Sequence, residues 1–154
     1  MTSVIYSKSL ASQFPQDLCP QCKVKNCEMK LDGFPKERII IDIDSRLPSI
    51  KPGRRCDYGI VADEAGTTFF LPVEFKSTNL DFTKVKEQLE GGINSFKEDL
   101  GTFICYPVLV SKSLKNQERK QLIKIQISSP YGQKTVKHVL CNKPLKWSEV
   151  KEAA

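Results

Sequence analysis

The chain has 154 residues, a formal net charge of +6 and a hydrophobic content of 40%, which suits a single domain with a hydrophobic core. No segment approaches the roughly 20 consecutive apolar residues of a membrane span, and residues 1–14 lack the apolar centre of a signal peptide. We therefore expect a cytoplasmic protein with no membrane partner. One histidine, His138, is present. Multi-histidine metal sites are thereby excluded, and chemistry must come from carboxylates, lysines or thiols.

We expect three parts within one domain: an N-terminal arm (1–37), a core (38–111) and a basic C-terminal hairpin and tail (112–154). In the arm, Tyr6, Leu10 and Phe14 recur at helical spacing, which fits either a short helix ending before Pro15 or an irregular segment. The modest basic excess is compatible with a nucleic-acid partner, although it also occurs in proteins that have none.

A cysteine-rich stretch follows the predicted helix. Cys19 and Cys22 are separated by two residues, a spacing that lets both sulfurs bind one metal ion. Cys27 is a candidate third ligand, and Cys56, Cys141 or His138 a fourth, with Cys56 preferred. A structural zinc site is one reading. Ordinary cysteines in a loop are the other, because a lone pair of this spacing is only a moderate signal.

The core begins with a β-branched strand at residues 38–44. Its Asp42 and Asp44 share one face, which we expect to meet solvent. A loop rich in proline and basic residues follows. Its Lys51, Arg54 and Arg55 precede Asp57 and are candidate contacts to phosphates, unless the loop is simply solvated.

Two strands, at residues 57–63 and 68–76, are predicted from their apolar, β-rich composition and the intervening turn. Side chains two apart in a strand share a face, so Glu74 and Lys76 point the same way. If the strands pair antiparallel, Asp57 lies beside both. Two carboxylates and an ammonium would then suit a hard cation such as Mg²⁺, which activates water and stabilises charge on a phosphate, with Lys76 assisting. Pro72 requires that the second strand be bulged or unpaired on one side.

The following segment predicts a helix at residues 83–100, with one apolar stripe and Gln88 next to it. Gly91 and Gly92 within it indicate a close approach by a strand or a nucleic-acid backbone, or a break between two helices. Residues 102–111 predict a strand buried on both faces and parallel to the Glu74 strand.

The C-terminal segment, residues 112–154, is rich in basic residues. It predicts a β-hairpin formed by residues 122–128 and 134–141. Lys134 and Lys137 on its basic face could follow a phosphate backbone, or could simply protect a sheet edge from aggregation.

Asp57, the Glu74-x-Lys76 pattern and the helical Gln88 together resemble the PD-(D/E)XK nuclease superfamily over residues 39–110. The resemblance implies an α/β, restriction-endonuclease-like fold, in which a mixed β-sheet is flanked by helices. It also implies catalytic roles for Asp57, Glu74, Lys76 and Gln88, with Mg²⁺ or Mn²⁺ held by the two carboxylates. Cys56 replaces the family's proline, and the upstream helical acid has no secure match.

The resemblance also bears on cofactors and partners. Some relatives hold an iron–sulfur cluster, so Cys19, Cys22, Cys27 and Cys56 are candidates for zinc or such a cluster. It implies a nucleic-acid substrate, with DNA favoured and RNA the alternative, roles in defence, restriction or repair, and a homodimer or partner protein. The alternatives are a catalytically inactive nucleic-acid- or protein-binding module on the same fold, and a small zinc-ribbon protein in which the acidic pair is incidental.

Overall fold

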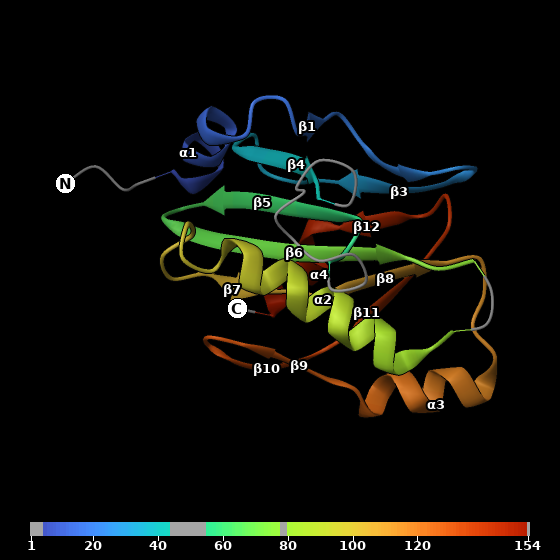
Figure 1. Cartoon of the computed structure of the whole chain (residues 1–154). Helices are drawn as coiled ribbons and strands as arrows, with labels where there is room; N and C mark the ends of the chain where they lie inside the picture. The colour runs from blue at the N-terminus through green and yellow to red at the C-terminus, as the bar shows by residue number, and fades with distance from the viewer. Residues whose placement is uncertain (1–4, 44–54, 78–79, 154) are drawn as a thin grey trace.

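The computed structural model describes residues 5–43, 55–77 and 80–153 (Figure 1). The protein is mixed α/β: one large sheet carries parallel and antiparallel strands, and helices flank it. The sheet order is β1-β4-β5-β6-β8-β11, with β7 also pairing to β6. Its strands are β1 (Leu18–Cys19), β4 (Arg38–Asp42), β5 (Tyr58–Glu64), β6 (Thr67–Phe75), β7 (Ile104–Cys105), β8 (Val108–Ser111) and β11 (Lys137–Leu140).

The two predicted strands pair antiparallel as the β5–β6 hairpin, which lies at the centre of this sheet. Ala65 and Gly66 both have positive φ, 52° and 82°, which is the geometry of a two-residue turn matched to the strand twist. The pairing runs from Glu64 opposite Thr67 to Tyr58 opposite Val73. Such a tight turn fixes the register, so residues far apart in sequence are brought together at the other end.

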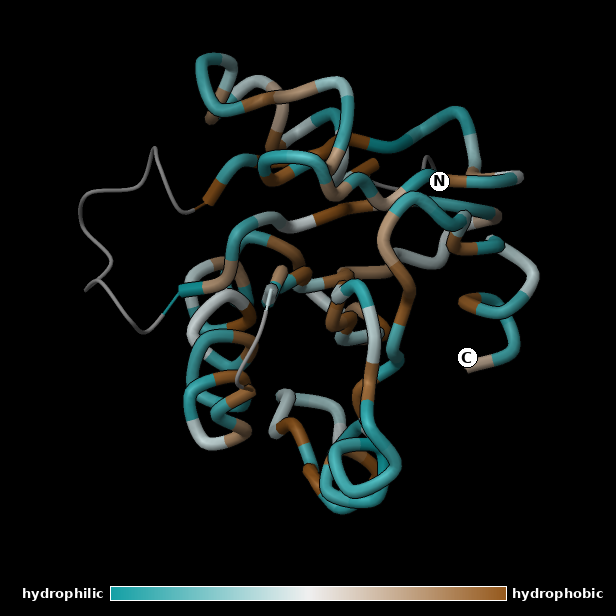
Figure 2. The backbone as a smooth tube through the Cα atoms, turned by 90° about the vertical axis from the view of Figure 1, so that its right-hand side faces the viewer, coloured by the Kyte–Doolittle hydropathy of each residue, from teal (hydrophilic) through white to brown (hydrophobic). Residues whose placement is uncertain are grey.

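Helices cover one face of the sheet. The predicted N-terminal helix is present as α1 (Tyr6–Gln13), and the core helix is continuous as α2 (Phe82–Phe96). Val85, Leu89, Ile93 and Phe96 of α2 are buried in a cluster with residues of β5 and β6. Hydrophobic residues concentrate along the strands in the middle of the molecule (Figure 2).

Contacts at Gly92 explain one of the two glycines of α2. A Cβ on Gly92 would lie 2.4 Å from Sγ of Cys56 and 3.6 Å from Cβ of Pro72. The close approach predicted from the sequence is therefore made by the sheet beneath the helix. Pro72 is paired to Gly59 on one side, while the pairs on its other side stop at Phe70 with β7 and resume at Val73 with β8. It is unpaired on that side, as expected.

The opposite face is covered by a second, three-stranded sheet of order β12-β3-β2 and by α4. Trp147 of α4 packs against Phe34 and Phe69, and its Nε1 donates to Oε2 of Glu64 at 2.9 Å. In this layer β3, from the N-terminal part of the chain, pairs with β12 from the C-terminal part. Residues 1–37 therefore contribute strands to the packed structure and do not form a separate arm. The elements of this layer are β2 (Cys22–Val24), β3 (Cys27–Asp32), β12 (Pro144–Lys146) and α4 (Trp147–Glu152).

The C-terminal segment differs from the predicted hairpin. Residues 116–124 form a helix, α3 (Asn116–Lys124), and the hairpin is the shorter pair β9 (Gln126–Ser129) and β10 (Gly132–Thr135). The chain then leaves the hairpin as β11, which pairs parallel with β8. The alternating apolar residues start inside α3, so the strand was predicted too early. None of the helices in the described segments is long and apolar enough to cross a membrane.

Candidate active site

Asp57 and Glu74 lie opposite each other at the open end of the central hairpin. Tyr58 pairs with Val73, and the next position of that register places Asp57 across from Glu74. Val61 and Phe70, an even number of residues away on each strand, belong to the cluster under α2. Because side chains alternate, both carboxylates face the α2 side of the sheet. This is the convergence predicted from the sequence.

Hydrogen bonds fix the two carboxylates. The backbone N–H of Asp57 donates to Oε1 of Glu74 at 3.1 Å, and the N–H of Phe75 donates to Oδ2 of Asp57 at 2.8 Å. Nζ of Lys76 lies 3.1 Å from Oε2 of Glu74. Each acid is therefore oriented by the other strand, and the ammonium closes the group on the side where β6 ends.

Glu74 is buried, with an exposed fraction of 2%, in a setting that disfavours its charge. Burial, followed by the charge of Asp57, raises the pKa of Glu74 to about 8, and Lys76 only partly opposes this. A carboxyl group with such a pKa carries a proton at neutral pH. It releases this proton readily when a cation other than the Lys76 ammonium binds next to it. Buried acids perturbed in this way cluster at functional sites.

Gln88 lies on α2 (Phe82–Phe96), the helix that packs on the same face of the sheet as the two carboxylates. The helix runs antiparallel to β6 (Figure 1), and Gly92 lies over Pro72. One helical turn back from Gly92 is Gln88, about 6 Å away along α2, and Glu74 is about 7 Å from Pro72 along β6. Oε1 of Gln88 is buried and has no hydrogen-bond partner among the described residues. A buried, unsatisfied oxygen is rare and indicates a missing ligand or water.

The donor set fits a hard divalent cation. It offers two carboxylates and the amide oxygen of Gln88, all oxygen ligands of the kind that Mg²⁺ and Mn²⁺ accept while keeping several waters. Over residues 5–43, 55–77 and 80–153, no group of three or more His, Cys, Asp or Glu side chains is placed to hold a metal ion.

The structure does not bring the four predicted cysteine ligands together. Cys27 forms a disulfide with Cys141, which removes its thiol from any metal site. Cys22 is buried in the core on the β3 side, whereas Cys56 is buried under α2 on the other face. Burial raises the pKa of both thiols well above the ordinary value. Cys19 is half-buried near Cys22 and its thiol donates to the Ile40 carbonyl at 3.6 Å.

The predicted phosphate contacts are scattered. Lys51 and Arg54 lie outside the described residues, as does Asp44, and Arg55 is half-exposed just before Cys56. Lys134 is half-buried on β10, and Lys137 is on β11, where Nζ is 2.9 Å from Oε2 of Glu149. Neither of these two lysines therefore belongs with Lys76. Asp42, which was expected to meet solvent, is half-buried; it pairs with Tyr58 and so faces away from Asp57.

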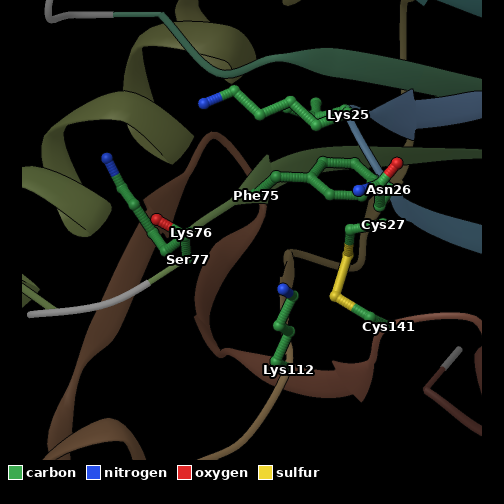
Figure 3. Close-up of a pocket in the computed structure, with 9 residues that line it drawn as sticks. Lys25, Asn26, Cys27, Phe75, Lys76, Ser77, Lys112 and Cys141 are labelled. Atoms are coloured by element: carbon green, nitrogen blue, oxygen red, sulfur yellow. A yellow bond between two sulfur atoms is a disulfide. The ribbon is translucent and has the colours of Figure 1, made fainter.

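Two lysines that the sequence did not single out as contacts lie close to Lys76. Lys25, at the tip of the β2–β3 hairpin, and Lys112, just after β8, line a pocket together with Lys76 (Figure 3). The position of Lys112 could have been predicted from the sequence. β6 and β8 are parallel and in register at Phe75 and Val110, so the residues that follow these two strands meet at one edge of the sheet. The position of Lys25 could not, because it depends on how the second sheet packs.

No protein-family model, curated protein or solved structure gives a significant match to this chain. The residues and their geometry are therefore what a functional proposal can use.

Proposed function

We propose that this protein is a metal-dependent nuclease with a restriction-endonuclease-like fold, hydrolysing phosphodiester bonds, with DNA as the preferred substrate. The observation that carries the proposal is the meeting of Asp57 and Glu74 on one face, with Nζ of Lys76 3.1 Å from Glu74. The order of elements supports the same fold: an antiparallel hairpin, a helix packed on it, and a parallel strand beside the second hairpin strand.

The residues have separate roles. Asp57 and Glu74 would hold the cation, which would stabilise charge on the scissile phosphate and lower the pKa of a bound water. Gln88 supplies its unsatisfied oxygen to this cation or to its water. Lys76, about one quarter exposed, can turn its ammonium from Glu74 towards the phosphate and offset the negative charge that grows there.

The raised pKa of Glu74 adds a condition. In the absence of a cation the buried carboxyl group keeps its proton, because Asp57 is beside it. Cation binding must displace that proton, so we expect the affinity for Mg²⁺ to rise with pH until about pH 8.

The test is cleavage of labelled single-stranded, linear duplex and branched DNA, and of RNA, with Mg²⁺ or Mn²⁺ and with a chelator. Wild type is compared with Glu74→Gln and Lys76→Ala, each confirmed folded by circular dichroism. The proposal expects metal-dependent cutting that both substitutions abolish. Nucleic-acid binding without cleavage of any substrate would indicate a binding module instead, and equal cutting by Glu74→Gln would expose a contaminating enzyme.

A further inference from the structure

A pocket of about 210 Å³ opens at the edge where β6 and β8 end, on the β3 side of the sheet, which is the face opposite to that of the Asp57–Glu74 pair (Figure 3). Lys76 belongs to both places: it lines the pocket and lies 3.1 Å from Glu74. A ligand in the pocket is therefore one side chain away from the two carboxylates.

The pocket is positively charged. Lys25, Lys76 and Lys112 come from three separate segments and surround it (Figure 3). Lys25 and Lys112 are exposed, and neither forms an ion pair with a carboxylate in the part of the chain that the structure describes. Three ammonium groups, of which two have no neutralising partner there, favour an anion such as a phosphate.

The wall of the pocket is apolar, which a phosphate alone does not require. Phe75 lines it, together with Val24 and the Cys27–Cys141 disulfide. The ring of Phe75 is held edge-on by Tyr58, with centroids 5.9 Å apart. Aromatic side chains next to cationic ones are the combination that binds an unpaired nucleotide, because the base stacks while the phosphate meets the lysines.

Lys25 is kept in place at a conformational cost. Its φ is +54°, in the left-handed region that favours glycine or asparagine. Asparagine would fit this turn position more easily, and Asn26 follows directly. The positive φ belongs to the two-residue turn in which Val24 pairs with Cys27, and this turn places the lysine on the rim of the pocket.

We propose that this pocket binds one unpaired nucleotide next to the scissile phosphate, with its base against Phe75 and its phosphate between Lys25 and Lys112. The inference rests on the proposed nuclease function and makes its substrate more specific. A base that is paired and stacked within a duplex cannot enter the pocket. The substrate class is thus single-stranded, flapped or frayed nucleic acid rather than intact duplex.

Binding is measured by fluorescence anisotropy in a Glu74→Gln background, so that nothing is cut. The probes are a labelled twelve-nucleotide thymidine strand and a blunt twelve-base-pair duplex. We expect the single strand to bind at least about tenfold more tightly than the duplex. Lys25→Asn, Lys112→Gln and Phe75→Leu should each weaken single-strand binding about fivefold, and each lysine change should lower its salt dependence.

Lys97→Asn is the matched control. Lys97 is exposed at the C-terminal end of α2, and its replacement changes the net charge by the same amount as Lys25→Asn. We expect it to alter binding less than twofold. Lys25→Asn should unfold at the same or higher denaturant concentration than its parent, because asparagine relieves the strained turn. Equal binding of both probes, or equal effects of Lys25→Asn and Lys97→Asn, would overturn the inference.

Cleavage by proteins that retain Glu74 separates the two proposals. If wild type and Lys25→Asn cut the blunt duplex at the same rate and as well as the single strand, the nucleotide pocket is wrong and the nuclease stands. If single-strand binding depends on Lys25 and Lys112 but no substrate is cut, the nuclease is wrong and the pocket stands.

Discussion

The two ends of the β5–β6 hairpin bury acids on the same face for different purposes. At the turn end, Asp63 accepts hydrogen bonds from the N–H of Ser7 at 2.8 Å and from Oγ1 of Thr68 at 2.6 Å. At the open end, Glu74 faces a second carboxylate, Asp57. The first acid is satisfied by neutral donors and ties α1 to the sheet. The second is held where its charge is disfavoured, as perturbed acids at functional sites are.

The largest expected effect is on catalysis at the open end. Glu74→Gln and Asp57→Asn should each lower the single-turnover cleavage rate at least about 10³-fold, because each removes a charged ligand of the cation. Asp63→Asn makes the same charge change on the same face and should keep its rate per folded molecule. A similar loss of rate in all three variants would break the distinction between the two ends.

The next effect is on stability at the turn end. Asp63→Asn should lower the free energy of unfolding by about 2 kcal/mol, because the neutral amide offers one acceptor oxygen where the carboxylate accepts from both Ser7 N–H and the Thr68 hydroxyl. Urea titration followed by circular dichroism measures this. A change below about 0.5 kcal/mol, within the range of surface substitutions, would mean that Asp63 does not hold α1.

A smaller effect is expected on Mg²⁺ binding when Gln88 is replaced. Gln88→Leu should weaken Mg²⁺ binding about tenfold, as loss of a supporting ligand does, while stability stays the same or rises because an unsatisfied oxygen is removed from the interior. Titration calorimetry and urea unfolding give both values. Gln121→Leu on the exposed surface of α3 is the control. Reduced stability with unchanged Mg²⁺ affinity would make Gln88 a packing residue.

The last expected effect concerns the pH dependence of stability. The pKa of Glu74 is about 8 in the folded protein against 4.5 ordinarily, so the unfolded chain loses this proton first as pH rises. The metal-free protein should therefore lose stability between about pH 4.5 and 8, by up to about 1 kcal/mol per pH unit. Glu74→Gln should remove this slope. Urea unfolding at pH 6 and pH 7.5 tests it, and an unchanged slope in the variant would contradict the assignment.

The sequence predicted the open end well because local rules determine it. A two-residue turn at Ala65 and Gly66 fixes the register, and strand alternation then places Asp57, Glu74 and Lys76 on one side. The helical stripe around Leu89 similarly fixed which side of α2 meets the sheet. These inferences need only the periods of strands and helices.

Features that depend on packing between distant segments were not predictable. Cys27 and Cys141 are 114 positions apart, and nothing in the spacing of the N-terminal cysteines indicates that partner. α3 was missed because its alternating apolar residues continue into β9, although the bond from Lys115 N to Oε1 of Glu118 at 2.9 Å is a helix-start signal. Lys25 reaches the pocket only through the second sheet.

The central claim is most directly tested by titrating the metal-free protein with Mn²⁺ and counting bound ions by electron paramagnetic resonance. We predict one Mn²⁺ per chain at pH 8, weaker binding at pH 6, and loss of the site in Glu74→Gln but not in Asp63→Asn. Absence of binding by the wild-type protein at millimolar Mn²⁺, or equal binding by Glu74→Gln, would contradict the account.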